Sequence, residues 1–229
     1  MSKKIVLVFC VIIALAFTGY FWQKNKKNTN QNNGKVLANK ERNLTAEQKQ
    51  IYLDRIQKAE ADLRGLNPTD ANYHISQIND HMYLGQQYFG LGQMEKSKQE
   101  FLTVLQIEPN YEPAFAALAL TYSDAGELPE AQLALESAIK SNSKNYNIWL
   151  QYIGVRQAMG ASNEELGQLY EDALLATSRY TDILTKYAQF EESVGNIAEA
   201  IALWEEALKN YPENAQFYNT EINRLKKLK

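Results

Sequence analysis

Residues 112–145 read EPAFAALALTYSDAGELPEAQLALESAIKSNSKN. This stretch divides into two amphipathic segments on either side of Gly126, so it predicts two helices joined by a tight turn. Small side chains such as Ala119 and Ala131 let the two predicted helices approach closely, and large ones such as Tyr122 fill the space around them. A single pair of this kind cannot bury its apolar face alone, so the core must come from stacked copies.

The same pattern recurs along the chain with a period of 34 residues. The copies align when one extra residue is allowed after Gly160, in a loop where an insertion costs little. Each copy carries a glycine between its two predicted helices, and Pro109 and Pro212 end their helices because proline cannot continue the hydrogen-bond ladder. The four blocks are 78–111, 112–145, 146–180 and 181–214.

These blocks resemble the tetratricopeptide repeat family. The first block shows the resemblance in Leu84-Gly85-x-x-Tyr88, and matched small and large residues recur in the other three. The resemblance covers residues 78–214 and implies an all-α, right-handed solenoid of antiparallel helix pairs. Two segments flank the repeats: residues 44–77 are predicted as an amino-terminal capping helix and lead-in, and residues 215–229 as a carboxy-terminal capping helix.

The chain departs from the family pattern at three serines. Ser97 stands where the family usually has alanine, and Ser143 and Ser178 stand where it usually has proline. The third and fourth blocks also resemble the half-a-TPR variant, for example through Trp149-x-x-Tyr152. Proteins with that variant often act in RNA processing, so an RNA-processing adaptor is the alternative function.

The amino-terminal segment predicts a membrane anchor. Residues 5–22 are an uninterrupted apolar run, about 27 Å long as a helix, which is close to the hydrocarbon thickness of a bilayer. We therefore expect residues 1–22 to be an uncleaved transmembrane helix, with a cleaved signal peptide as the alternative. Residues 23–43 are polar and rich in Asn and Lys, which predicts a flexible tether.

Lysines flank the apolar run on both sides, so charge alone leaves its orientation open. Short amino-terminal anchors commonly export the domain attached to them, which favours a bacterial inner-membrane protein with its repeats on the extracytoplasmic side.

Charge and composition exclude several classes of function. Residues 1–42 carry eight Lys/Arg and one acidic residue, whereas residues 43–229 carry sixteen basic and twenty-six acidic residues, a net charge of −10. An acidic body is a poor start for binding nucleic acid. The only histidines are His74 and His81, and the only cysteine is Cys10. We therefore expect no enzymatic activity, no bound metal and no cofactor.

The family resemblance also implies a binding site, because the first helices of successive repeats line a concave groove. At those positions this chain lacks the basic residues that clamp a peptide carboxylate in chaperone-binding members, and the groove would be apolar at its start and acidic at its far end. We expect a peptide with apolar anchors there, although partners on the convex side remain an alternative. The predicted groove residues are Asn79, Met82, Gln86, Phe89, Ala116, Leu120, Ser123, Asn147, Leu150, Gln157, Asp182, Gln189 and Glu192. The sequence thus predicts a membrane-tethered interaction scaffold that assists assembly of an envelope complex.

Overall fold

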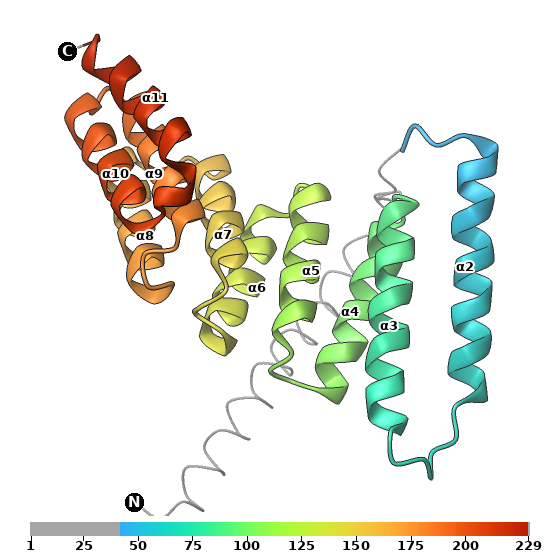
Figure 1. The fold of residues 1–229 in the computed structure, drawn as a ribbon. Coiled ribbons are helices and arrows are strands. Elements are labelled where there is room, and N and C mark those ends of the chain that lie inside the picture. Colours follow the sequence, from blue (N-terminus) through green and yellow to red (C-terminus); the bar gives the residue numbers. More distant parts are fainter. Residues whose placement is uncertain (1–41, 229) are drawn as a thin grey trace, which may run out of the picture.

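The computed structural model describes residues 42–228, so the predicted anchor and almost all of the predicted tether lie outside the described residues. Every regular element within 42–228 is helical, as predicted, and Figure 1 shows the helices stacked from α2 to α11. The elements are α2 (Ala46–Gly65), α3 (Tyr73–Gly90), α4 (Met94–Ile107), α5 (Glu112–Asp124), α6 (Leu128–Ser141), α7 (Tyr146–Ala158), α8 (Asn163–Ala176), α9 (Thr181–Ser193), α10 (Ile197–Asn210), the short 3₁₀ helix η1 (Pro212–Asn214) and α11 (Ala215–Lys226).

Glycine turns join the helices within each of the four pairs, α3–α4, α5–α6, α7–α8 and α9–α10. Each turn holds one glycine at a φ between 78° and 87°, a conformation that side chains rarely adopt. The turn between α7 and α8 covers residues 159–162 and is one residue longer than its counterpart at 125–127. This extra residue accounts for the offset in the sequence repeat at Gly160.

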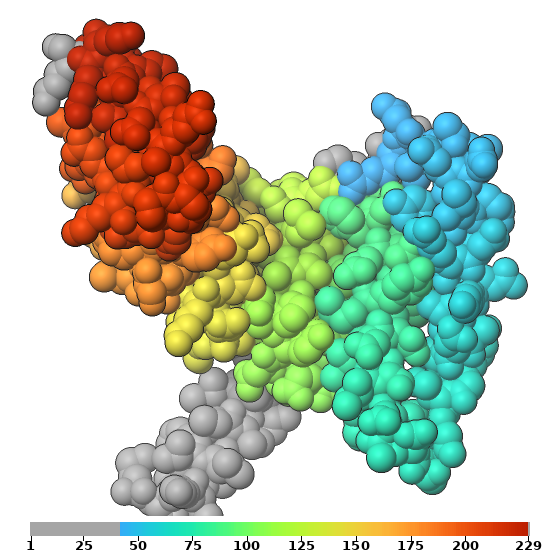
Figure 2. Space-filling view, viewed as in Figure 1, coloured from blue at the N-terminus to red at the C-terminus, as the bar shows by residue number. Residues whose placement is uncertain are grey.

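The helices form two layers that differ in how closely their members approach. The first helices of successive pairs contact one another, α3 with α5, α5 with α7, and α7 with α9. Within residues 42–228 no such contact joins the second helices α4, α6, α8 and α10. Because neighbouring pairs are closer on the side of the first helices, the array curves toward that side. Figure 2 shows α2 and the carboxy-terminal helices at opposite ends of the curved array.

A continuous apolar core runs through the stack from Phe101 to Leu225. Its largest fully buried side chain is Trp204, which contacts the rings of Phe217 and Tyr218 and so joins the last repeat to the capping helix α11. A smaller cluster fixes α2 against α3 at the other end. Both flanking helices therefore bury apolar side chains that would otherwise face water.

The serines that replace family residues have clear structural roles in two cases. The Ser97 hydroxyl is fully buried and donates a hydrogen bond of 2.8 Å to the carbonyl oxygen of Gly85, so the polar group is satisfied where the family usually has alanine. Ser178 takes a left-handed conformation with φ of 56° after the end of α8. The following amide, that of Arg179, then donates to the carbonyl of Leu174 at 2.7 Å and closes a Schellman motif.

A capping box begins α2. The amide of Gln48 donates to the Thr45 hydroxyl at 3.1 Å, and the amide of Thr45 donates to the Gln48 side chain at 2.9 Å. This reciprocal pair satisfies two amides that the first helical turn leaves without partners.

Position 85 requires glycine because there is no room for a side chain there, and its backbone conformation is an ordinary helical one. A Cβ at Gly85 would lie 2.5 Å from the ring of Phe101, and that ring is buried and cannot move aside. We expect Gly85→Ala to lower the free energy of unfolding by about 1–2 kcal/mol, because overpacking outweighs the gain in helix propensity.

Gly154→Ala is the matched control, since a Cβ at Gly154 in α7 would meet nothing within 4 Å. There the same substitution should raise the free energy of unfolding by about 0.5–1 kcal/mol. Urea unfolding followed by circular dichroism measures both changes. Equal effects of the two substitutions would contradict a close approach between α3 and α4.

Candidate partner-binding groove

The predicted groove residues lie on the first helices α3, α5, α7 and α9, and none of them is fully buried. Since these helices contact one another in order, residues from neighbouring repeats lie on one continuous face. The exposed members are Asn79, Gln86, Leu120, Asn147, Gln157 and Gln189, and the half-buried ones are Met82, Phe89, Ala116, Ser123, Leu150, Asp182 and Glu192.

Apolar side chains occupy the centre of this face. Leu120 on α5 is 50% exposed, so its side chain is accessible from this face. Met82 on α3 and Leu150 on α7 lie on the two neighbouring first helices and pack partly against the main core. Met82, Leu120 and Leu150 thus place one partly accessible apolar side chain on each of three successive first helices, and we call these three residues the apolar strip.

The amino-terminal end of the face is covered by Arg42. Its guanidinium lies 4.8 Å from the centre of the Phe89 ring, and its Nη2 donates to Asp124 Oδ2 at 2.5 Å. Nη2 also donates to the carbonyl oxygen of Phe89 at 3.4 Å. Arg42, near the end of the segment predicted as a tether, therefore contacts both α3 and α5.

The opposite end of the face was predicted to be acidic, but its Glu192 is paired. Arg224 of the capping helix α11 donates two hydrogen bonds of 2.7 Å to the two carboxylate oxygens of Glu192. These bonds and the positive charge of Arg224 lower the pKa of Glu192 below its usual value. The carboxylate charge is thus compensated within the chain, so it attracts a basic ligand less than an isolated glutamate would.

A hollow of about 330 Å³ lies between α9 and α11. It contains the predicted groove residues Asp182 and Gln189, together with Lys186 and two aromatic residues of α11, Phe217 and Tyr218. Phe217 is 51% exposed, so its ring is accessible from this hollow. The capping helix therefore extends the face by one more helix and adds an aromatic wall that the sequence prediction did not include.

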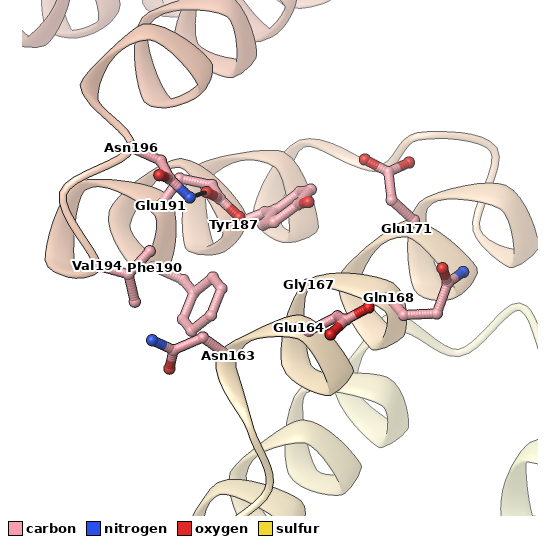
Figure 3. Close-up of a pocket in the computed structure, with 10 residues that line it drawn as sticks. All are labelled: Asn163, Glu164, Gly167, Gln168, Glu171, Tyr187, Phe190, Glu191, Val194 and Asn196. Carbon is pink, nitrogen blue, oxygen red and sulfur yellow. Dashed lines mark hydrogen bonds between the residues drawn. The ribbon is translucent and has the colours of Figure 1, made fainter.

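A second hollow, of about 340 Å³, lies between α8 and α9 and outside the predicted groove (Figure 3). Its wall includes Phe190 and Tyr187 of α9, and Tyr187 stacks on Tyr170 of α8 at a centroid distance of 5.0 Å. Glu191 is buried here and accepts a hydrogen bond of 2.7 Å from the Asn196 side chain. Glu191 and Glu192 are neighbours in sequence, and paired glutamates on a helix usually lie on a solvent-exposed face. Glu191 instead points inward and is buried.

Burial raises the pKa of the Tyr187 hydroxyl, and the nearby Glu191 carboxylate raises it further. The hollow thus presents neutral aromatic rings beside carboxylates and contains no positively charged residue.

The histidines show no sign of a metal site. His81 is half-buried, and its Nδ1 lies 2.7 Å from Glu100 Oε2. His74 contacts the ring of Tyr73 edge-on. Within residues 42–228 no group of three or more His, Cys, Asp or Glu side chains is placed to hold a metal ion.

Comparison with known proteins identifies the repeat. The model of the family described as "Tetratricopeptide repeat" matches residues 84–111, which include the end of α3 and all of α4. The comparison thus shows a tetratricopeptide repeat at residues 84–111.

Parts of the chain are similar to two mouse proteins. Interferon-induced protein with tetratricopeptide repeats 3 is 28% identical over 141 residues, which are 60% of this chain and 34% of that protein. Protein RRP5 homolog is 27% identical over 113 residues, which are 48% of this chain and 6% of that protein. The chain therefore spans about a third or less of the length of these curated relatives.

Three solved structures share the fold. BtubC from P. vanneervenii has a TM-score of 0.59 at 14% identity, covering 80% of this chain and 84% of that one. MamA has a TM-score of 0.54 at 17% identity, covering 76% and 98%. PilF from Pseudomonas aeruginosa has a TM-score of 0.51 at 22% identity, covering 66% and 68%. At these identities the likeness shows the fold alone.

The ion pair between Glu192 and Arg224 predicts a titration behaviour. Because the folded state lowers the pKa of Glu192, the pair stabilises the fold above the usual carboxyl range, and this stabilisation is lost as the pH falls through the lowered pKa. We expect Arg224→Ala to move the pKa of Glu192 upward toward its usual value. Carboxyl-carbon NMR titration measures this change.

Lys226→Ala is the matched control, because it removes a cation of α11 that pairs with Glu205 instead. The pKa of Glu192 should stay low in that variant. A low pKa for Glu192 in the Arg224→Ala variant would rule out the ion pair as its cause.

Proposed function

We propose that this chain is a membrane-tethered scaffold that holds a peptide or partner protein against the first helices α3, α5, α7 and α9, and that it assists assembly of an envelope complex. The observation that carries this proposal is the apolar strip of Met82, Leu120 and Leu150 on the inner side of the curved array. Burying a leucine side chain contributes about 1.5–3 kcal/mol, so a few apolar anchors suffice for useful affinity.

The polar border of the strip supports a peptide as its occupant. Asn79 and Gln86 on α3, and Asn147 and Gln157 on α7, present exposed side-chain amides on either side of Leu120. An amide both donates and accepts hydrogen bonds, so it matches the main-chain groups of an extended peptide without demanding a particular side chain. The apolar strip then selects the anchors and the amides hold the backbone.

The proposed membrane tether is supported by the sequence. The apolar run at 5–22 has the length of a transmembrane helix, and the polar segment after it ends at Arg42, beside the face we assign to the partner. Within residues 42–228 no helix combines the length and the apolar character needed to cross a bilayer. We infer that an anchor at 1–22 presents the repeats at a bacterial inner membrane, on its extracytoplasmic side.

An RNA-processing adaptor of the half-a-TPR kind ranks second. Arg179 and Arg224, which lie in and beside the repeats that resemble this variant, make ion pairs with Glu206 and Glu192, respectively. Guanidinium groups that are already paired with carboxylates contribute less to phosphate binding.

Leu120→Lys tests the role of the strip. A charge at the centre of the strip should reduce capture of the native partner at least about tenfold, because the anchor would have to be buried against an ammonium group. Photo-crosslinking from position 86 in native membranes, followed by quantification of the crosslinked species, measures capture.

Leu175→Lys is the matched control, since Leu175 is 73% exposed on α8, in the layer of second helices. This variant should capture the partner as well as the unchanged chain does. If Leu175→Lys reduced capture and Leu120→Lys did not, the partner would bind the convex side and the proposal would be wrong.

Fusion of alkaline phosphatase to the carboxy terminus tests the proposed orientation. The enzyme folds to its active form only where its disulfides can form, outside the cytoplasm. We expect an active fusion in the membrane fraction. A stable but inactive fusion would place the repeats in the cytoplasm.

A further inference from the structure

We propose that Phe89 and Asp124 form a guanidinium-binding subsite at the amino-terminal end of the groove, that it receives an arginine of the partner peptide, and that Arg42 fills it until the partner arrives. The inference rests on the proposed groove function and names one chemical feature of the ligand. Its support is the set of contacts that Arg42 makes with Phe89 and Asp124.

The subsite offers three different groups that recognise a guanidinium. The Asp124 carboxylate accepts a hydrogen bond at 2.5 Å, and the Phe89 ring lies under the planar cation at 4.8 Å from its centre. The Phe89 carbonyl oxygen accepts a longer bond of 3.4 Å. A guanidinium stacks on a ring while it donates in its own plane, which the compact ammonium of lysine does less well. The arrangement therefore selects arginine over lysine.

Arg42 fills the subsite without satisfying all of its own donors. Its side chain is 27% exposed and that of Asp124 is 18% exposed, so the ion pair is largely removed from water. The Nε of Arg42 is buried and has no hydrogen-bond partner. An unpaired buried donor costs free energy, so Arg42 is an imperfect occupant that an arginine approaching from the groove can replace.

The local structure allows Arg42 to leave without unfolding α2. Arg42 precedes the capping residue Thr45 by three positions and lies in a segment without helical hydrogen bonds. The packing of α2 against α3 depends on Ile56 and Ala59, which are buried against Leu84 and Tyr88 farther along the helices. Movement of residues 42–44 therefore leaves the capping box and this cluster in place.

The other end of the groove provides a useful contrast. Arg224 likewise reaches the last turn of a first helix, where it pairs with Glu192. However, Arg224 belongs to a regular helix that buried Ile222 and Leu225 hold in place, and it also pairs with Glu221. Arg224 is thus a fixed part of the fold, whereas Arg42 lies on an extended segment that can exchange with a ligand.

The test uses the full-length chain in detergent and a fluorescein-labelled peptide with the sequence of residues 38–46, ANKERNLTA. Fluorescence anisotropy measures its binding. The Arg42→Ala chain, which lacks the arginine that competes for the subsite, should bind this peptide about tenfold more tightly than the unchanged chain, because competition from Arg42 for nine-tenths of the time weakens apparent affinity by about that factor. The same peptide with alanine in place of its arginine should not bind either chain.

Adding Asp124→Asn to the Arg42→Ala chain should abolish binding of the arginine peptide, since the carboxylate is lost while the size of the side chain is kept. Arg55→Ala is the matched control, because Arg55 is an exposed arginine of α2 and its loss should leave peptide binding at the level of the unchanged chain. Thermal melting confirms that each variant is folded. Equal peptide binding by the Arg42→Ala and unchanged chains would overturn the subsite.

Capture of the native partner separates this inference from the proposed function. If Leu120→Lys abolishes capture while Asp124→Asn leaves it unchanged, the groove binds its partner without the subsite, and the inference fails alone. If the peptide experiment gives the expected result but Leu120→Lys leaves capture unchanged, the subsite stands and the proposed groove function fails.

Discussion

The close approach of two helices across a residue with little or no side chain is the constraint on which this array depends. Gly85 leaves room for only the ring of Phe101, and the buried pairs Ala119 with Ala131 and Ala188 with Ala200 stand at the matching places of later repeats. In α3–α4, α5–α6 and α9–α10 this close approach makes the large side chains pack against the next pair, whereas α7–α8 carries Ile153 and Leu166 at the matching places. The first helices then lie in contact, and their outward sides become a continuous face.

The sequence predicts most of this fold because its signals are local. A glycine between two amphipathic segments, alanines at matched positions and one extra residue near Gly160 each specify a feature within a single repeat. The ends of the groove could not be predicted in this way. Arg42 and Asp124 are 82 positions apart, and Glu192 and Arg224 are 32 apart, so no local pattern connects them. The sequence places the predicted groove on the first helices, but it does not indicate the residues that cover its ends.

The structure pairs some of the acidic residues of the groove with arginines that are distant in sequence. The described repeats are rich in carboxylates, yet those at the two ends of the inner face are matched by arginines from the flanking segments. The pairing of Asp124 and Glu192 therefore reduces the negative charge that these two residues contribute to the groove, and Met82, Leu120 and Leu150 add apolar side chains between them. Apolar contacts provide affinity there, while the paired ends restrict where a charged ligand residue can sit.

In the part of the chain that the structure describes, each helix pair contacts only the neighbouring pairs, and this affects how the number of repeats can change during evolution. Because α3 meets α5 but not α7, the middle of the array has no partner farther away within residues 42–228 that fixes the number of pairs. A whole block can be duplicated or lost by recombination while the joints on either side are rebuilt from equivalent surfaces. The two ends cannot be duplicated in this way. The contact of Trp204 with α11 and the contact of Arg42 with α5 have no equivalent at the other pairs within residues 42–228. Growth of the array is thus confined to its interior, and lengthening it would separate its two ends without altering either one.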